Sequence, residues 1–109
     1  MTTANDLRKL VLAMTVGLCD AIEQEALPIG EASHYLFSPR TMRLFVDDHE
    51  VNEIIHLASE LEDIARLVPD ALGEAVVDIR NKAMVAIRNT PPCDYQQGPW
   101  LNKLLPIER

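Results

Sequence analysis

Residues 47–68 have the sequence DDHEVNEIIHLASELEDIARLV. The aliphatic side chains of this stretch recur every three to four positions, at Val51, Ile54, Ile55, Ala58, Leu61, Ala65 and Val68. That period is typical of an amphipathic α-helix with one face in a core. Acidic side chains at Asp47 and Asp48 favour a helix start there, because they lie at the positive end of the helix dipole.

The sequence before this stretch predicts three further helices. The first begins at Asn5 or Asp6, ends at the Leu-Pro-Ile-Gly sequence of 27–30, and has its main apolar stripe at Leu7, Leu10, Val11, Met14, Leu18 and Ile22. A short helix follows over about 31–37. The Ser38 hydroxyl and Pro39 then start another, because serine caps a helix and proline fits its first turn. Met42, Phe45 and Val46 form its apolar face.

The sequence after residue 68 predicts a fifth helix. Pro69-Asp70 caps it, and Pro91-Pro92 ends it. Its stripe consists of Leu72, Val76, Ile79, Ala83, Ala86 and Ile87. No run alternates apolar and polar residues over the length of a strand. We therefore predict an all-α fold, a single-domain bundle over 1–109 with about five helices, two of them short.

Residues 90–109 form a Pro-rich apolar C-terminal tail. Besides its prolines it contains large apolar side chains, at Trp100, Leu101, Leu104, Leu105 and Ile107. So apolar a segment is expected to be covered rather than solvated. We expect it to dock on the bundle as a lid, with a partner-binding segment as the alternative.

Composition restricts the compartment and the class of ligand. The formal net charge is −7, which argues against a nucleic-acid binder, because that function needs a basic face. No apolar stretch reaches the length of a membrane span. Cys19 and Cys93 do not form a disulfide or zinc motif, so we expect free thiols in a cytoplasmic protein. The alternative is a signal peptide in Arg8 to Cys19, disfavoured by Leu18 before the cysteine and by Asp6.

The excess negative charge lies in one predicted helix. Residues 47–63 contain seven acids and no lysine or arginine, whereas the other residues hold ten acids and ten bases. At 100° per residue, five side chains fall within about 40° of one direction, opposite the aliphatic face: His49, Glu53, His56, Glu60 and Asp63. We predict a partner-binding surface made of Asp47, Asp48, His49, Glu53, His56, Glu60 and Asp63. A solvated polar face without a partner is the alternative.

Two Glu-x-x-His strings, Glu31 to His34 and Glu53 to His56, raise a metal-binding alternative. Pairs of such strings build di-iron sites in helical bundles, but there the ligands point into the core. The Glu53 to His56 string points away from the aliphatic face, so we expect no metal and no cofactor. No serine or cysteine has the neighbours of a nucleophile, and no glycine-rich phosphate loop is present. We therefore expect no catalytic residues and no enzyme activity.

The first helix also has apolar residues on a second side, at Leu12, Val16 and Cys19. A helix with two apolar faces is either central or contacts another subunit. We predict a homodimer through these three residues, with an isologous contact. A structural homo-oligomer without another role is a further alternative.

The string Tyr35-Leu36-Phe37-Ser38-Pro39 and the later Leu61-Glu62-Asp63 resemble a known family. The sequence is similar, over roughly residues 7–80, to a family of small uncharacterised bacterial proteins that share these strings. The resemblance implies a bacterial, cytosolic origin and no particular activity. Physically, Tyr35 and Phe37 beside the Ser38-Pro39 helix start are expected to form a structural corner.

These patterns together favour a binding protein without catalysis. Seven acids on one helix would steer a basic partner and cover a basic site on it. Small acidic bacterial proteins of this kind are often immunity proteins for secreted toxins. We therefore expect an immunity- or antitoxin-like inhibitor whose 47–63 helix covers the basic groove of a toxin domain, such as a nuclease.

Overall fold

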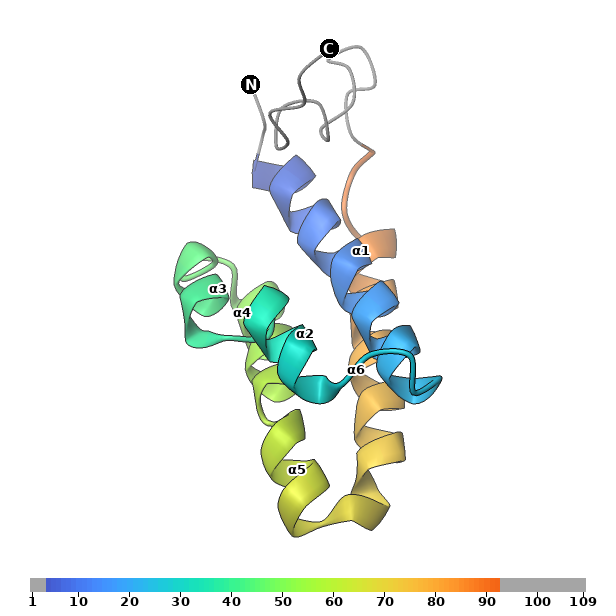
Figure 1. The fold of residues 1–109 in the computed structure, drawn as a ribbon. Coiled ribbons are helices and arrows are strands. Elements are labelled where there is room, and N and C mark those ends of the chain that lie inside the picture. The colour runs from blue at the N-terminus through green and yellow to red at the C-terminus, as the bar shows by residue number, and fades with distance from the viewer. Residues whose placement is uncertain (1–3, 93–109) are drawn as a thin grey trace, which may run out of the picture.

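The computed structural model describes residues 4–92, which are helical with short connections (Figure 1). The α-helices are α1 (Ala4–Glu23), α2 (Ile29–Tyr35), α3 (Pro39–Leu44), α4 (His49–Ser59), α5 (Leu61–Leu67) and α6 (Leu72–Arg88). A single 3₁₀ turn, Pro69–Ala71, precedes α6. The predicted all-α class is confirmed for these residues. The predicted docking of the C-terminal tail falls on 93–109, outside the described residues.

The two long helices, α1 and α6, pack along each other in opposite directions and form the centre of the fold (Figure 1). Helix α4 packs against α6 and also contacts α1, whereas α5 lies against the start of α6. The short helices α3 and α2 pack on α4 and α5 respectively. As a result, one side of α4 faces the core and the other side is left for solvent or a partner.

The core combines side chains from all six helices and the turn after α2. Its largest fully buried apolar side chains are Phe37, Leu12, Ile55, Leu61, Ile79, Val51 and Val76. The predicted inward stripes of the long acidic stretch and of α6 supply most of them. Phe37 is buried, but Tyr35 is 59% exposed, so only one of the two aromatic residues in the Tyr-Leu-Phe-Ser-Pro string forms the expected corner.

The single helix predicted over 47–68 is wrong, because the chain forms two helices there. The break is at Glu60, whose backbone N–H donates to the Leu57 carbonyl at 3.2 Å in a tightened last turn. Ala58 and Leu61 on either side are both fully buried, so the hydrophobic period continues through the break and conceals it. Val68, beyond the end of α5, is 55% exposed rather than part of the buried stripe.

The predicted orientation of the first helix is wrong in part: Val11 and Ile22 of the predicted stripe are buried, but the centre of the buried face lies elsewhere. Its buried residues are Val11, Leu12, Thr15, Cys19 and Ile22, whereas Met14 of the predicted main stripe is 41% exposed. Thr15 is tolerated inside because its hydroxyl donates to the Val11 carbonyl at 2.9 Å. Leu12 and Cys19 are fully buried within the chain itself. Two of the three residues predicted for a homodimer contact are therefore not at the surface, whereas a homodimer as such stays a prediction.

The observed helix starts agree in part with those predicted from the sequence. Asp48 caps α4 as predicted, accepting the Val51 backbone N–H at 3.2 Å. Ser38 occupies the cap position of α3, with Pro39 in the first turn, but its hydroxyl makes no capping hydrogen bond. Asp70 does not cap α6, because the 3₁₀ turn intervenes and α6 begins after Ala71. Val46 is 75% exposed, in contrast to its predicted place on a buried face.

Burial of Cys19 makes stability sensitive to alkaline pH. Removal from water raises the pKa of its thiol to about 12, from an ordinary value of 9.0. The native state therefore keeps a proton that the unfolded state releases above pH 9. The contribution of the buried Cys19 thiol to the free energy of unfolding is complete below pH 9 and is lost as pH rises toward 12. Between pH 9 and pH 10 we expect a loss of about 1 kcal/mol in the free energy of unfolding.

Urea denaturation at the two pH values measures this loss. Cys93→Ser is introduced throughout, so that Cys19 is the remaining thiol, and Cys19→Ala in that background is the control. The alanine variant should be less stable at every pH yet show the smaller decline. Equal declines in the two proteins would show that Cys19 does not titrate as its burial requires.

Candidate functional site

The structure places the seven predicted partner-binding residues on and around α4 and α5. Six of them are exposed: Asp47, His49, Glu53, His56, Glu60 and Asp63. The outward direction predicted for His49, Glu53, His56, Glu60 and Asp63 is therefore confirmed, although two helices carry them instead of one. The seventh residue, Asp48, is half-buried.

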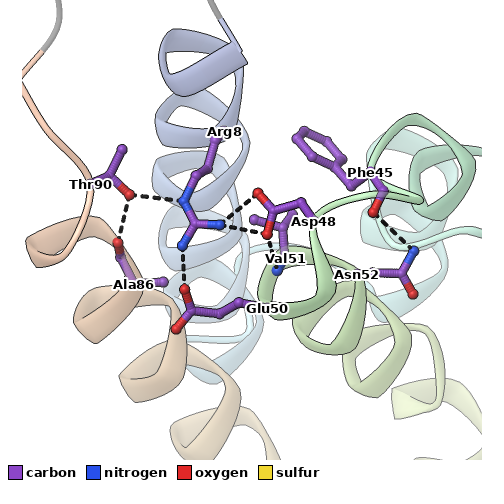
Figure 2. Close-up of polar contacts among 8 residues, drawn as sticks. All are labelled: Arg8, Phe45, Asp48, Glu50, Val51, Asn52, Ala86 and Thr90. Atoms are coloured by element: carbon purple, nitrogen blue, oxygen red, sulfur yellow. Dashed lines mark hydrogen bonds and ion pairs between the residues drawn. The ribbon is translucent and has the colours of Figure 1, made fainter.

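Asp48 belongs to a polar cluster around Arg8 (Figure 2). The guanidinium of Arg8 donates from Nη1 to both carboxylate oxygens of Asp48 at 2.6 Å, and from Nη2 to Glu50. Its Nε donates to the Thr90 hydroxyl at 3.0 Å, and that hydroxyl donates to the Ala86 carbonyl at 2.7 Å. One side chain thus joins α1, the start of α4 and the end of α6.

This cluster stabilises the fold, and we call its residues Arg8, Asp48, Glu50 and Thr90 the clamp. Burial alone lowers the pKa of Arg8, but hydrogen bonds and attraction from Asp48 and Glu50 outweigh it and raise the pKa above its ordinary value. The arginine side chain is only 15% exposed, so solvent screens these contacts less than it screens ordinary surface pairs. Asp48 and Glu50 therefore stabilise the fold through their contacts with Arg8. These two of the seven acids in residues 47–63 thus pair with an arginine from another helix.

The remaining acids form the acidic face, defined here as Asp47, Glu53, Glu60, Glu62 and Asp63. All five are exposed. Only Asp63 makes an ion pair with another described residue, with Arg66 at 3.1 Å; both side chains are about two-thirds exposed, so the pair is weak. Within residues 4–92 the other four carboxylates have no cationic partner. The acidic face therefore has an excess of negative charge along the outside of α4 and α5, where Arg66 pairs with one of its five acids.

A groove of about 330 Å³ borders this face, between α4 and α6. Glu50 and Glu53 line it from α4, over Ile54, and Asn81, Lys82 and Val85 line it from α6. Its size is at the lower limit of small-ligand pockets, but it holds no pair of groups arranged as nucleophile and base. We regard it as an edge of the acidic face.

The metal-binding alternative finds no support in the described residues. Glu31 and His34 are exposed on α2, and Glu53 and His56 are exposed on α4. Among residues 4–92, no three or more His, Cys, Asp or Glu side chains lie close enough together to hold a metal ion. The two Glu-x-x-His strings thus do not combine into one site.

Three polar residues that position the site were not predicted from the sequence. Arg8 and Thr90 complete the clamp, and the Asn52 side-chain amide donates to the Met42 carbonyl at 2.7 Å, which fixes the end of α3 against α4. One signal for Arg8 was available. It is separated from Leu12, Thr15, Cys19 and Ile22 by four, seven, eleven and fourteen positions, the spacing of the true inward face of α1.

The family of the chain follows from comparison with known proteins. A family model described as "Protein of unknown function (DUF3969)" matches residues 2–102, so the chain belongs to that family. No curated protein and no solved structure matches it. Membership in an uncharacterised family is therefore confirmed, whereas the shared Tyr-Leu-Phe-Ser-Pro string and a bacterial origin stay predictions. None of the helices in the described part is long and apolar enough to cross a membrane.

Proposed function

We propose that the protein is a non-catalytic binding module whose acidic face covers a basic site on a protein partner. The observation that carries the proposal is the exposure of Asp47, Glu53, Glu60 and Glu62 with no cationic partner among the described residues. If this surface had no binding role, basic residues among the acids would make the helices more stable, because like charges at helical spacing repel one another.

The ion pairs of the arginine residues support the same proposal. Arg8 and Arg80, each paired with two acids, join separate helices, and Arg66 pairs weakly with Asp63. A surface of one sign steers an oppositely charged protein toward it and speeds encounter, and it disfavours partners of the same sign. The partner we propose is therefore a protein with a basic surface.

The finer proposal is an immunity- or antitoxin-like inhibitor that acts in the cytoplasm. A toxin nuclease needs a basic groove to hold phosphates, and an acidic helical face would occupy that groove in place of nucleic acid. Cys19 forms no disulfide within residues 4–92, and a chain with only two cysteines suits a reducing compartment. Inhibition then needs only complementary charge and shape.

Affinity capture with charge-reversed variants tests the proposal. Glu53→Lys, Glu60→Lys and Asp63→Lys together reverse the acidic face and change the formal net charge from −7 to −1, two units for each of three residues. The immobilised wild type should retain a basic protein from extracts of the source organism, and the face variant should lose it. Raising the salt concentration should release it as well, because exposed charges are screened.

Glu25→Lys, Asp70→Lys and Glu74→Lys together make the matched control. These three acids are exposed elsewhere on the molecule, and their reversal gives the same net charge of −1. The control variant should retain the basic protein as the wild type does. If both variants lose the same proteins, only total charge matters; if neither loses any, the acidic face is not a binding surface.

A further inference from the structure

The groove of about 330 Å³ between α4 and α6 combines an apolar wall with two carboxylates. Val85 lines it from α6 and is 48% exposed, whereas Ile54 lines it from α4 and is almost fully buried. Glu50 and Glu53 are exposed on the α4 side, three positions apart and therefore neighbours on the helix surface. This arrangement suits a side chain that is apolar along its stem and positively charged at its end.

Both carboxylates have capacity for a cation that enters the groove. Arg8 binds one oxygen of Glu50, and the other oxygen points away from Arg8 (Figure 2). An ionised carboxylate accepts hydrogen bonds at both of its oxygens. Glu53 makes no ion pair with any residue of 4–92. Glu50 therefore keeps one oxygen, and Glu53 keeps two, for a further donor.

The cation that lines the groove from α6 does not neutralise these acids. The ammonium of Lys82 pairs with Asp78, one turn earlier on α6, at 3.9 Å, and with no other described carboxylate. Counted together with the clamp, the charged groups in and beside the groove are four acids and two bases, Asp48, Glu50, Glu53 and Asp78 against Arg8 and Lys82. This excess of negative charge attracts a further cation.

From these observations we infer that the groove between α4 and α6 receives an arginine side chain of the basic partner, with its stem against Val85 and its guanidinium donating to Glu50 and Glu53. Arginine fits better than lysine, because the planar guanidinium donates to two acceptors at once. The guanidinium of Arg8 already does so with Asp48 and Glu50. The volume is at the lower end of ligand pockets, which suits one long side chain. The inference rests on the proposed function for the identity of the partner.

Methyl NMR of the full-length protein tests the inference, with the Nα-acetyl amide of arginine as the probe. At constant ionic strength this probe should shift the methyl signals of Ile54 and Val85 in a saturable way. The corresponding amide of citrulline has nearly the same shape but no charge, and it should leave both signals in place. The lysine amide should bind more weakly than the arginine amide.

Four single variants, followed through the Ile54 methyl signals, separate the groove from the surrounding charge. Glu53→Gln should weaken binding of the arginine probe about threefold to fivefold, as expected for one exposed ion pair, and Glu60→Gln should change it less than about twofold. Both residues are exposed acids of the acidic face, but only Glu53 lines the groove. Val85→Asn should also weaken binding, whereas Met84→Asn should not, because Met84 is 38% exposed but lies outside the groove.

The inference is overturned if Glu53→Gln and Glu60→Gln weaken binding equally, or if the arginine and citrulline probes act alike. It is also overturned, while the proposed function stands, if the captured basic protein depends on Glu53, Glu60 and Asp63 but the arginine probe leaves Ile54 and Val85 unshifted. The reverse result is selective binding of the arginine probe in the groove without any captured protein that depends on the acidic face. That result would support the arginine site and contradict the proposed function.

Discussion

Replacing Phe37 by alanine is expected to lower the free energy of unfolding by about 3–5 kcal/mol, the usual cost of deleting a buried aromatic side chain. Phe37 is 2% exposed and is the largest fully buried side chain described. The turn after α2 directs it inward, because the backbone N–H groups of Leu36 and Phe37 both donate to the Ala32 carbonyl. A domain of this size has only about 5–15 kcal/mol of stability in total, so the variant should be close to unfolding.

Tyr35→Ala is the control for this prediction, because it removes the other aromatic residue of the same Tyr-Leu-Phe-Ser-Pro string. Tyr35 is 59% exposed and contacts His34 edge to face, so its loss should change stability by no more than about 0.5 kcal/mol. Urea denaturation followed by circular dichroism measures both variants. Equal destabilisation would contradict the assignment of Phe37 to the core and Tyr35 to the surface.

Removing the guanidinium of Arg8 is expected to cost about 2–3 kcal/mol, because hydrogen bonds to charged groups of low exposure are lost and Asp48 is left without its cation. Arg8→Met is the preferred variant, since it keeps most of the apolar stem of the side chain. The figure is below that of a fully buried ion pair, because the carboxylates of Asp48 and Glu50 are 27% and 47% exposed.

Arg40→Met is the matched control, because Arg40 is exposed on α3 and makes no ion pair with any described residue. Its replacement should change stability by less than about 0.5 kcal/mol. Asp48→Ala should also destabilise less in the Arg8→Met background than in the wild type, since the two residues act on one interaction. Additive effects of the Arg8 and Asp48 substitutions, measured by urea denaturation, would contradict the clamp.

The sequence predicted the helices better than their orientation. Stripes of purely apolar residues located the long acidic stretch and α6, and Asp48 was recognised as a cap. The same reasoning failed on α1, because the buried face there contains Arg8 and Thr15, whose polar groups are satisfied by hydrogen bonds. A search for apolar side chains alone selected a rival stripe that includes the exposed Met14.

The candidate site was predicted in its direction but not in its composition. Spacing alone showed that Glu53, Glu60 and Asp63 point outward, because the opposite face of the helix is aliphatic. Spacing could not show that Asp48 and Glu50 pair with Arg8, which is 40 and 42 residues away in sequence. Pairing between distant residues depends on how α1 and α4 pack, and local patterns do not encode that.

The most direct test of the acidic face as a binding surface is the dissociation constant of the captured basic partner, measured for three proteins at one salt concentration. These are the wild type, the Glu53→Lys, Glu60→Lys and Asp63→Lys variant, and the equally charged Glu25→Lys, Asp70→Lys and Glu74→Lys variant. We predict that the face variant binds at least about a hundredfold more weakly, or about 2.7 kcal/mol, and that the control stays within a few fold of the wild type. Equal dissociation constants for the two variants would contradict the account.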